Sequence, residues 1–464
     1  MNLFLPSDPR PVHFVGIAGA GMSALAMLAL RRGVSVTGSD RSPEGAPDLP
    51  GLGAKVLQGH DPRYVEQARA VIASAAIPAD HPELVRARQL GLPVVSRKVA
   101  LAQLVADGRT VAIAGTHGKT TTTVMTTEAL VAAGFNPSAL AGGRVSAWGG
   151  NARVGSDRLF VVEADEYDRA FLELHPEVAV INNVEPEHLE CYDGSVEVME
   201  QGFATFAGRA ATVLAGNADP GTERVVRRLE ALPLGQGPGR VWRFGPGARD
   251  LNVLAVRTGS SGSEAEVRVP DGRTMTLALR VPGMHNVRNA LGALGAVAAM
   301  GGSLEPAAEA LARFTGVARR FEVRGQAGGV TVVDDYAHHA TEVEATLSAA
   351  RQAYPHRRIV AAFQPHLYSR TAVQAESLGR VLAEADLVFV TEVYAAREAP
   401  IAGVTGANVV HHAVQAGGDA RFVSNRADLL ERILAAVEPG DVVLTLGAGD
   451  ITTLGPDLLE RLRG

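Results

Sequence analysis

The sequence predicts an α/β protein of three domains, each built on a mainly parallel sheet. Its length of 464 residues allows two to four domains of ordinary size. Short runs rich in Val, Ile and Ala, bounded by turn residues, are typical of buried strands, and helical segments alternate with them. This alternation recurs in three consecutive stretches. Strands that alternate with helices form doubly wound parallel sheets, so we expect that architecture in each stretch.

The first stretch predicts a Rossmann-like domain over residues 1–106. It opens with the strand PVHFVGIAG, the helix MSALAMLALRRG and the strand VSVTGSD. A further strand lies in ARAVIASAA, and the stretch ends near VVSRKVALAQLV.

The second stretch predicts a central α/β domain over residues 107–316. It opens with the strand in RTVAIAG, and LFVVEAD and VAVINNVEP are further buried strands. Residues 240–283 alternate apolar and polar side chains between Gly-rich turns, which predicts a small antiparallel patch. The helix HNVRNALGALGAVAAMG follows.

The third stretch predicts a second Rossmann-like domain over residues 317–464. Its strands are expected in VTVVDD, RRIVAAF, ADLVFVTEV and DVVLTLGAGD.

Composition excludes several classes of partner. The net charge is −6 and no basic block is present, which argues against nucleic acid and against an anionic membrane surface. The apolar runs are too short to span a bilayer, and MNLFLPSDPRP has no apolar run of signal-peptide length. The single cysteine, Cys191, cannot form an intramolecular disulfide, which suits the cytoplasm. We therefore expect a cytoplasmic monomer or homodimer that acts on small molecules.

The first glycine-rich loop resembles a dinucleotide fingerprint. Gly19, Gly21 and Ala24 fit G-x-G-x-x-A after a predicted strand, and Asp40 follows Gly19 by 21 residues. Such a loop holds a pyrophosphate at a helix N-terminus. Taken alone, the pattern predicts an NAD-dependent dehydrogenase.

A second phosphate loop changes this interpretation. The segment GTHGKTT lies between a predicted strand and a predicted helix, and it comprises Gly115, Thr116, His117, Gly118, Lys119, Thr120 and Thr121. Backbone N–H groups at the helix start bind phosphate oxygens, Lys119 supplies charge to the β- and γ-phosphates of ATP, and Thr120 offers a hydroxyl to Mg²⁺. A dehydrogenase needs no such loop, whereas an enzyme that joins two substrates can use both.

The use of basic residues singles out Lys119. The chain contains 41 arginines and three lysines, of which Lys55 and Lys98 lie in no recognisable motif. Because this sequence uses Arg wherever charge alone is needed, a lysine in a phosphate loop indicates a chemical requirement.

Acidic and imidazole side chains follow the next predicted strands. Glu163 ends LFVVEAD, at the carboxyl edge where ligands bind in α/β sheets, and is the best candidate ligand for Mg²⁺. Asp165, Glu166 and Asp168 crowd the same turn, where a solvated acidic loop is an equal alternative. His188 follows VAVINNVEP, and a water-mediated or catalytic role is as plausible for it as metal ligation.

Histidines gather in the third stretch, in DDYAHH and in QPHLYSR. A zinc site is one interpretation, but no cysteine lies nearby. Arg370 beside His366 favours recognition of an anion, such as the carboxylate of an amino acid.

Together these motifs resemble the Mur ligases, and the resemblance covers nearly the whole chain in order. The blocks that carry it are HFVGIAGAGMSALA, GTHGKTTTT, EADEYD, NNVEPEHLECY, PGMHNVRNALGA, GVARRFE, DDYAHHATEVEATL and FQPHLYSRT. The match favours the branch that uses ATP to join L-alanine to UDP-N-acetylmuramate in peptidoglycan synthesis. It implies a first domain for the UDP-sugar, a central P-loop ATPase-like domain, and a third domain that admits the amino acid and closes over ATP.

The resemblance also implies a role for individual residues. Lys119, Glu163, His188 and Arg320 are implied to be catalytic, with Thr120, Glu163 and His188 around the metal. ATP is expected to contact the phosphate loop together with His285, Asn289, Arg320 and, as a ribose contact, Asp335. The UDP-sugar is expected at Gly19, Gly21, Met22, Ser23, Asp40 and Ser74. The amino acid is expected at Tyr336, His338, His366 and Arg370.

The chain departs from the family pattern at several positions. Ala337 and Ala340 replace a Gly and a Pro, and Leu367 replaces an Arg whose contacts Arg370 would have to meet. Tyr167, Asn182 and Glu187 stand where Ser, Thr and Asp are commoner. No lysine follows Lys119, so no carbamylated lysine is available to hold a second metal, as in the alanine-adding branch.

The implied reaction passes through an acyl phosphate, which the amine of L-alanine then attacks. Charge on the transferring phosphoryl group is met by Lys119, Arg320 and Mg²⁺, and His188 or His338 serves as the base. Because Arg320 and the ATP loop lie in different domains, closure is expected. Three alternatives stay open: a family branch that attaches a recycled tripeptide, an NAD-dependent dehydrogenase built on the Gly19 loop, and a non-catalytic nucleotide switch.

Overall fold

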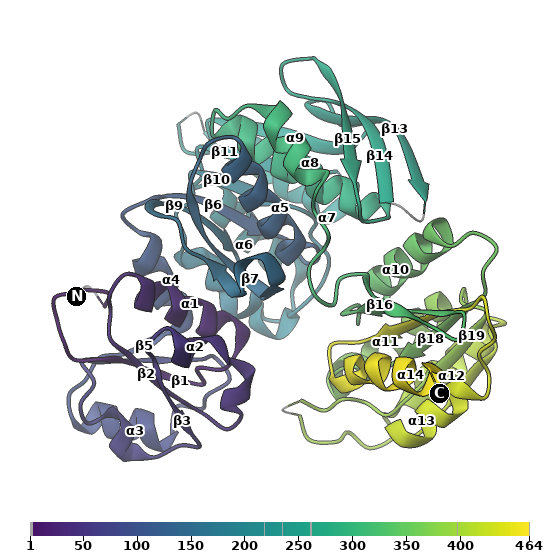
Figure 1. The fold of residues 1–464 in the computed structure, drawn as a ribbon. Coiled ribbons are helices and arrows are strands. Elements are labelled where there is room, and N and C mark those ends of the chain that lie inside the picture. Colours follow the sequence, from purple (N-terminus) through teal and green to yellow (C-terminus); the bar gives the residue numbers. More distant parts are fainter. Residues whose placement is uncertain (1–2, 218, 234, 260–261, 397, 464) are drawn as a thin grey trace. The chain divides into compact units, whose positions relative to one another are not determined.

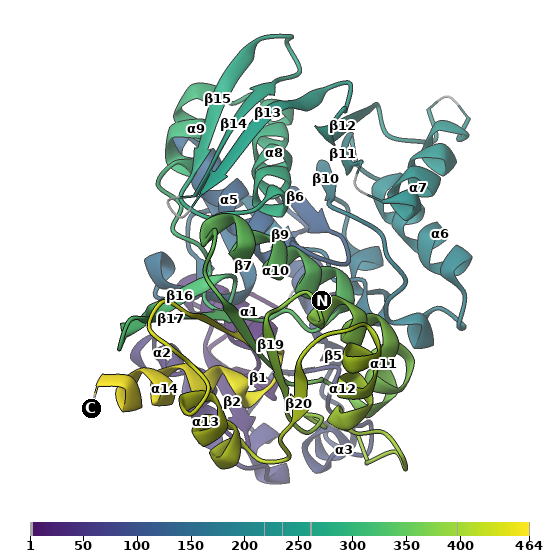
Figure 2. The same cartoon turned by 90° about the vertical axis from the view of Figure 1, so that its right-hand side faces the viewer.

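A computed structural model describes residues 3–217, 219–233, 235–259, 262–396 and 398–463 (Figures 1 and 2). The Cα positions group into two compact units. The first comprises Met1–Ala255, Ala265–Leu277 and Arg288–Arg313, and the second comprises Val256–Glu264, Ala278–Val287 and Phe314–Gly464. The predicted α/β architecture is confirmed, with three sheets that are mostly parallel.

The N-terminal sheet is entirely parallel, with strand order β3-β2-β1-β4-β5. Its strands are β1 (Val12–Val15), β2 (Val36–Asp40), β3 (Lys55–Gln58), β4 (Ala70–Ala73) and β5 (Val94–Ser96). Its helices are α1 (Ala20–Arg31), α2 (Asp48–Gly51), α3 (Pro82–Gln89) and α4 (Arg97–Val105). Strand β1 is buried on both faces, because Phe14 packs into one hydrophobic core and Val15 into another. This double burial explains why three of its four residues are apolar, and the fourth, His13, is buried with a hydrogen-bond contact to Glu83.

The central sheet has ten strands in the order β15-β14-β13-β12-β11-β10-β6-β9-β7-β8. They are β6 (Arg109–Ala114), β7 (Pro137–Val145), β8 (Gly150–Arg153), β9 (Ser156–Glu163), β10 (Val178–Ile181), β11 (Thr212–Gly216), β12 (Arg240–Pro246), β13 (Leu251–Gly259), β14 (Gly262–Arg268) and β15 (Thr274–Leu279). The helices are α5 (Lys119–Ala132), α6 (Val196–Ala207), α7 (Pro220–Glu230), α8 (Met284–Ala299) and α9 (Leu304–Leu311). Strand β7 pairs antiparallel with β8, and β13 to β15 follow one another at the opposite edge, within the segment expected to form an antiparallel patch.

Helix α1 of the N-terminal sheet packs against β7 and β8 of the central sheet, within the first compact unit. One hydrophobic core includes Phe14 and Leu25 from the first stretch and Leu140 and Phe160 from the second. The first two domains therefore share buried apolar surface, which fixes the two glycine-rich loops within one unit.

The third sheet lies in the second unit, with strand order β16-β17-β21-β18-β19-β20. Its strands are β16 (Glu322–Ala327), β17 (Val330–Asp335), β18 (Ile359–Phe363), β19 (Leu387–Val390), β20 (Ala420–Phe422) and β21 (Val442–Leu446). Its helices are α10 (Ala340–Ala353), α11 (Tyr368–Leu382), α12 (Gly406–Gln415), α13 (Arg426–Leu434) and α14 (Leu454–Arg463). Only β16 pairs antiparallel among the pairings described in this sheet.

Burial of β18 on both faces explains the two helical layers of this domain. Ile359, Ala361 and Phe363 point into the core formed with α10 and α11, while Val360 and Ala362 point into the core formed with α13 and α14. Successive side chains of a strand point to opposite faces, so an uninterrupted apolar strand requires a helical layer on each side.

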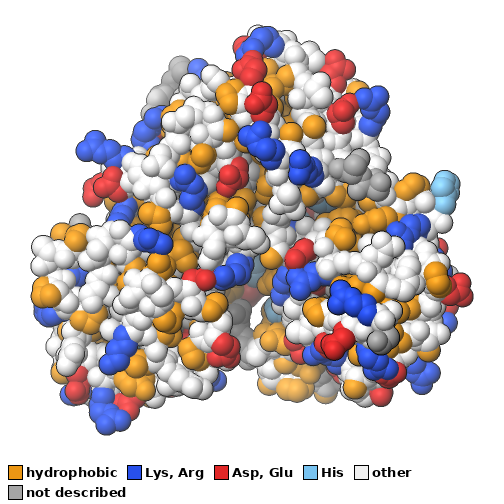
Figure 3. Space-filling model, in the orientation of Figure 1, with side chains coloured by type: hydrophobic (Ala, Val, Ile, Leu, Met, Phe, Trp, Pro, Cys, Tyr) orange, Lys and Arg blue, Asp and Glu red, His pale blue; other side chains and the backbone are white. Residues whose placement is uncertain are grey.

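On the face drawn in Figure 3, Lys and Arg side chains are interspersed with Asp and Glu side chains. Among the residues that the structure describes, none of the helices combines the length and the apolar character needed to cross a bilayer.

Candidate active site

The first glycine-rich loop connects β1 to α1 and is held by its neighbours in the sheet. The backbone N–H groups of Gly16 and Ile17 donate to the carbonyl of Ser39 at 2.8 and 3.1 Å. The carboxylate of Asp40 accepts from the N–H of Ala18 at 2.9 Å and from Ser42 at 3.0 Å. Gly19 caps α1, and no side chain caps that helix start. The helix N-terminus thus retains the character of an anion site.

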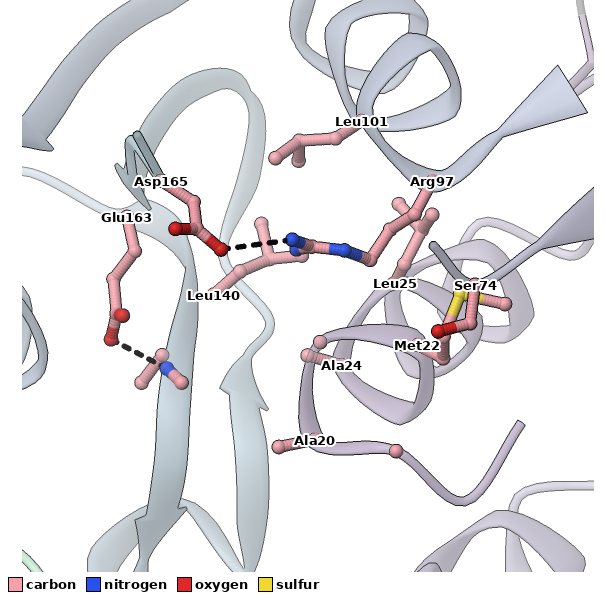
Figure 4. Close-up of a pocket in the computed structure, with 14 residues that line it drawn as sticks. Ala20, Met22, Ala24, Leu25, Ser74, Arg97, Leu101, Leu140, Glu163 and Asp165 are labelled. Carbon is pink, nitrogen blue, oxygen red and sulfur yellow. Dashed lines mark hydrogen bonds and ion pairs between the residues drawn. The ribbon is translucent and has the colours of Figure 1, made fainter. Parts of the chain in front are cut away.

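A cavity of about 310 Å³ opens at this helix N-terminus, within the first unit (Figure 4). Four residues predicted to bind the UDP-sugar line it, namely Gly19, Gly21, Met22 and Ser74. The other two have structural contacts of their own: the hydroxyl of Ser23 donates to the carbonyl of Ala20, and Asp40 holds the loop as described above.

The cavity also contains three charged residues, of which the motifs did not reveal Arg97. Arg97, at the start of α4, donates to the carboxylate of Asp165 at 3.2 Å (Figure 4). Glu163, at the end of β9, accepts from the N–H of Gly142 at 2.5 Å. One wall of the cavity thus carries a cation suited to a pyrophosphate, and the opposite wall carries two carboxylates.

The second glycine-rich loop connects β6 to α5 and needs glycine at two positions. Gly115 and Gly118 have φ angles of +135° and +78°, in the region that L side chains rarely adopt. A Cβ on Gly118 would lie 2.6 Å from the amide oxygen of Asn289. Asn289, a predicted ATP contact, therefore lies next to the loop. His285 lies at the start of α8, in the second unit.

Residues that follow β10 anchor the rest of this loop. The N–H of His117 donates to the side-chain oxygen of Asn183 at 2.8 Å. The hydroxyl of Thr116 accepts from the N–H of Glu185 at 2.9 Å. Thr120 and Thr121 are buried in the first turn of α5. The loop after β10 therefore fixes the geometry of the phosphate loop.

Lys119 is engaged by four acceptors in this structure. Its Nζ donates to the carbonyls of Gly115 at 2.7 Å and Thr116 at 3.3 Å, and to both carboxylate oxygens of Glu166 at 2.9 and 2.8 Å. Burial by itself lowers the pKa of Lys119, but the charges of Glu166 and Asp165 outweigh burial and hold that pKa above its usual value. Lys119 is therefore a permanent cation in the loop.

The acidic turn comprises residues 163–168, and its carboxylates lie near both glycine-rich loops. Glu163 and Asp165 line the cavity at the first loop, while Glu166 turns to the second loop and contacts Lys119. The side chain of Glu166 is 2% exposed, which excludes the solvated acidic loop for this residue. The backbone of Asp168 and Arg169 has φ angles of +53° and +52°, which marks the turn as locally strained.

A group of side chains able to hold a cation lies beside this turn. Ligand atoms of Glu166, Glu187 and His188 lie within 4.8 Å of one another. His188 thus has carboxylates around it, as a metal role requires. Glu163 instead faces the cavity, so the metal set of Thr120, Glu163 and His188 stays a prediction.

The residues predicted to meet the amino acid converge in the second unit. His338 follows β17 and His366 follows β18, and their rings form an edge-to-face contact with centroids 5.6 Å apart. Arg370 contacts Nδ1 of His366 at 3.1 Å, and the ring of Tyr336 lies edge-on to His338 at 5.2 Å. These groups form a basic and aromatic cluster at the carboxyl edge of the sheet, which suits a carboxylate ligand.

Tyr394, which no motif indicated, stacks on His366 with a ring separation of 5.9 Å and an interplanar angle of 15°. It follows β19, and its N–H donates to the carbonyl of Pro365 at 2.8 Å. Leu367 has a φ of +68°, a left-handed conformation at the position of the missing family arginine. Its N–H donates to the carbonyl of Tyr394 at 3.0 Å, so this contact helps to hold the strained turn.

Asp335 and Arg320 lie at the base of the same cluster. Asp335 accepts from the N–H groups of Phe321 at 2.6 Å and Ala337 at 2.8 Å. Burial raises the pKa of Asp335 to about 6, against the charge of Arg320. The guanidinium of Arg320 lies over the ring of Tyr336, 5.1 Å from its centroid. In this structure Asp335 has a structural role at the start of the loop, and its ribose contact stays a prediction.

Comparison with protein families matches three consecutive regions of the chain. Residues 11–109 match the Mur ligase family catalytic domain, residues 113–297 match the Mur ligase middle domain, and residues 319–449 match the Mur ligase glutamate ligase domain.

Curated relatives and solved structures agree with these matches. The chain is 44% identical to UDP-N-acetylmuramate–L-alanine ligase of Mycolicibacterium vanbaalenii, with 99% of this chain and 97% of that protein covered. The crystal structure of UDP-N-acetylmuramate-alanine ligase from Thermotoga maritima matches with a TM-score of 0.83 and 30% identity, covering 97% of this chain and 98% of that one. A murein peptide ligase from Psychrobacter arcticus matches with a TM-score of 0.72 and 25% identity, over 98% of both chains. The chain therefore belongs to the Mur ligase family.

Proposed function

We propose that this chain is an ATP-dependent ligase that joins L-alanine to the lactyl carboxylate of UDP-N-acetylmuramate, a step of peptidoglycan precursor synthesis in the cytoplasm. The curated relatives at 41–44% identity over nearly the whole chain carry this name. The arrangement of residues Glu163 to Glu166 is the observation that carries the proposal. Glu163 and Asp165 face the cavity at the first loop, and Glu166 contacts the lysine of the second loop. One short turn thus connects a site for a diphosphate sugar with a site for ATP.

The chemistry requires activation, because a carboxylate does not exchange its oxygen for an amine unaided. In the first step, an oxygen of the lactyl carboxylate attacks the γ-phosphorus of ATP. The bond from that phosphorus to the β–γ bridging oxygen breaks, which releases ADP and leaves an acyl phosphate. Lys119 and Arg320 offset the negative charge that spreads over the transferring phosphoryl group.

In the second step, the neutral amine of L-alanine attacks the acyl carbon. The carbon–nitrogen bond forms, the carbon–oxygen bond to phosphate breaks, and the amine loses a proton. His188 and His338 are the two candidates for the base that takes this proton. His366 and Arg370 would hold the carboxylate of L-alanine.

We also propose a Mg²⁺ ion at the acidic turn, held by Thr120, Glu163 and His188 with Glu187 added from the structure. The donors are mostly oxygen atoms, as Mg²⁺ prefers, and ligand atoms of Glu187 and Glu166 lie within 4.8 Å of the imidazole of His188. When bound, the ion would neutralise charge on the β- and γ-phosphates.

Release of phosphate from ATP tests this proposal. The full chain is incubated with MgATP and UDP-N-acetylmuramate, with and without L-alanine, and then with serine, glycine or the tripeptide L-alanyl-γ-D-glutamyl-meso-diaminopimelate in its place. The proposal expects sustained phosphate release with L-alanine, and omission of the UDP-sugar should abolish it. Turnover with the tripeptide but not with L-alanine would contradict the assignment in favour of a murein-peptide ligase. Hydride transfer to NAD without phosphate release would contradict it in favour of a dehydrogenase.

A further inference from the structure

Glu166 and Lys119 form a bidentate ion pair inside the ATP loop. Both carboxylate oxygens lie within 2.9 Å of Nζ, and the side chains of Glu166 and Lys119 are 2% and 17% exposed. Water screens such a pair far less than it screens a surface pair, so each charge depends on the other.

The backbone at Glu166 is held in place by a buried side chain. The hydroxyl of Tyr192 donates to the carbonyl of Glu166 at 2.6 Å, and Tyr192 is completely buried. The guanidinium of Arg169 lies over the ring of Tyr192, 5.2 Å from its centroid. These contacts fix the backbone of Glu166, and Lys119 lies at the end of a longer and more flexible side chain. Lys119 can therefore move further than the carboxylate.

No donor of Lys119 is left over for a phosphate in this arrangement. An ammonium group has three N–H donors. The two oxygens of Glu166 and the carbonyl of Gly115, all within 2.9 Å, use three, and the carbonyl of Thr116 lies at 3.3 Å. A phosphate oxygen can reach Nζ only by displacing one of these acceptors. Glu166 is the acceptor that a triphosphate replaces best, because it is the anion among them and repels the incoming charge.

We infer that Glu166 is the counter-ion of Lys119 in the ATP loop: its carboxylate competes with the phosphates of ATP for Nζ and yields the lysine to them when ATP binds. The inference rests on the proposed use of the loop for ATP. It assigns Glu166 a role separate from phosphoryl transfer, as a positioning residue that acts through Lys119. The exchange of one anionic partner for another keeps the buried ammonium compensated in both states.

The test is the affinity for ATP of the variant Glu166→Gln, which keeps the size of the side chain and removes its charge. The full chain is titrated with ATP in EDTA, so that no cation bridges carboxylate and phosphate. We expect the dissociation constant to fall by about tenfold, equivalent to about 1.4 kcal/mol. Glu177→Gln is the matched control, because Glu177 also pairs with a cation in the same unit, at Arg109, but is partly exposed and away from the loop. Its affinity for ATP should equal that of the wild type.

A double-mutant cycle shows whether the effect passes through Lys119. In a Lys119→Met background, Glu166→Gln should change the dissociation constant by no more than about threefold. An equal gain in both backgrounds, or an unchanged or weaker affinity in Glu166→Gln alone, would overturn the inference. If Glu166→Gln does not fold, Glu166→Asp takes its place, because the shorter side chain loosens the contact and should strengthen ATP binding by about threefold. Absence of MgATP binding by the wild type, titrated separately without EDTA, would instead contradict the proposed function.

Discussion

The two glycine-rich loops of the first unit have the same backbone plan and differ in their source of positive charge. Each follows a buried strand and precedes a helix whose N-terminus attracts anions. At the first loop the cation is Arg97, which comes from another helix, and the cavity beside it is open. At the second loop the cation is Lys119, the first residue of the helix itself, and it is buried against Glu166. The backbone plan is that of an anion site in both loops, and on the proposed function the side chain decides whether the site holds a diphosphate or promotes phosphoryl transfer.

Removal of Lys119 should have the largest effect. Lys119→Ala is expected to lower the rate of phosphate release by about 1,000-fold or more, because the transferring phosphoryl group loses a preorganised cation. Initial rates at saturating substrates measure this, and circular dichroism checks that the fold persists. Near-normal turnover would contradict the proposal that the second loop, unlike the first, promotes phosphoryl transfer through its lysine.

Substitution of one glycine by alanine in each loop should have the second-largest effect. Gly118→Ala is expected to weaken ATP binding by about tenfold or more, because its φ of +78° and the Asn289 oxygen 2.6 Å from the new Cβ leave no suitable conformation. In Gly21→Ala the new Cβ meets Nη1 of Arg97 at 2.8 Å, the far end of a flexible side chain that can move aside. Calorimetric titration of Gly118→Ala with ATP and of Gly21→Ala with UDP-N-acetylmuramate should show the larger loss of ligand affinity in Gly118→Ala. Equal tolerance at both positions would contradict the role given to the positive φ of Gly118 and to its close neighbour Asn289.

Arg97→Ala should affect the first loop alone. We expect KM for UDP-N-acetylmuramate to rise by about tenfold while KM for ATP stays within about twofold, because a charge-assisted contact to the diphosphate is lost. Steady-state kinetics with one substrate varied at a time measures both values. A matching rise in KM for ATP would show that Arg97 serves both sites.

Asp40→Ala should have the smallest effect. Its carboxylate accepts from the N–H groups of Ala18 and Ser42, so we expect a loss of about 1 kcal/mol in the free energy of unfolding and a rise of about threefold in KM for UDP-N-acetylmuramate. Chemical denaturation and kinetics measure the two quantities. A rise in KM of about 100-fold at unchanged stability would show that Asp40 binds the UDP-sugar directly, as the sequence predicted.

The sequence predicted the architecture because periodic burial determines it. Strands such as Ile359–Phe363 are apolar at every position, which only a sheet covered on both faces accommodates. The phosphate loop could also be predicted, because Gly115, Gly118 and Lys119 determine its geometry and charge within a few residues of sequence.

Contacts between segments that are distant in the sequence were harder to predict. The turn that contains Glu166 fits a solvated loop as well as a buried ion pair, and only the packing of β9 beside β6 brings it to Lys119. Arg97 lacked a motif for the same reason, since its partner Asp165 lies 68 residues further along the chain. For Asp40 the motif indicated a ligand contact, whereas in this structure the carboxylate holds the loop backbone. Local pattern therefore predicted the candidate sites, and long-range packing determines which side chains lie at them.

The separate binding of two ligands to Lys119→Met tests the central claim most directly. The claim is that the first loop holds the UDP-sugar and the second holds ATP, although both lie in one compact unit. Calorimetric titration of the full chain should show ATP affinity reduced by about 100-fold and UDP-N-acetylmuramate affinity within about twofold of the wild type. Loss of UDP-N-acetylmuramate binding to the same extent as ATP binding, or retention of full ATP affinity, would contradict the account.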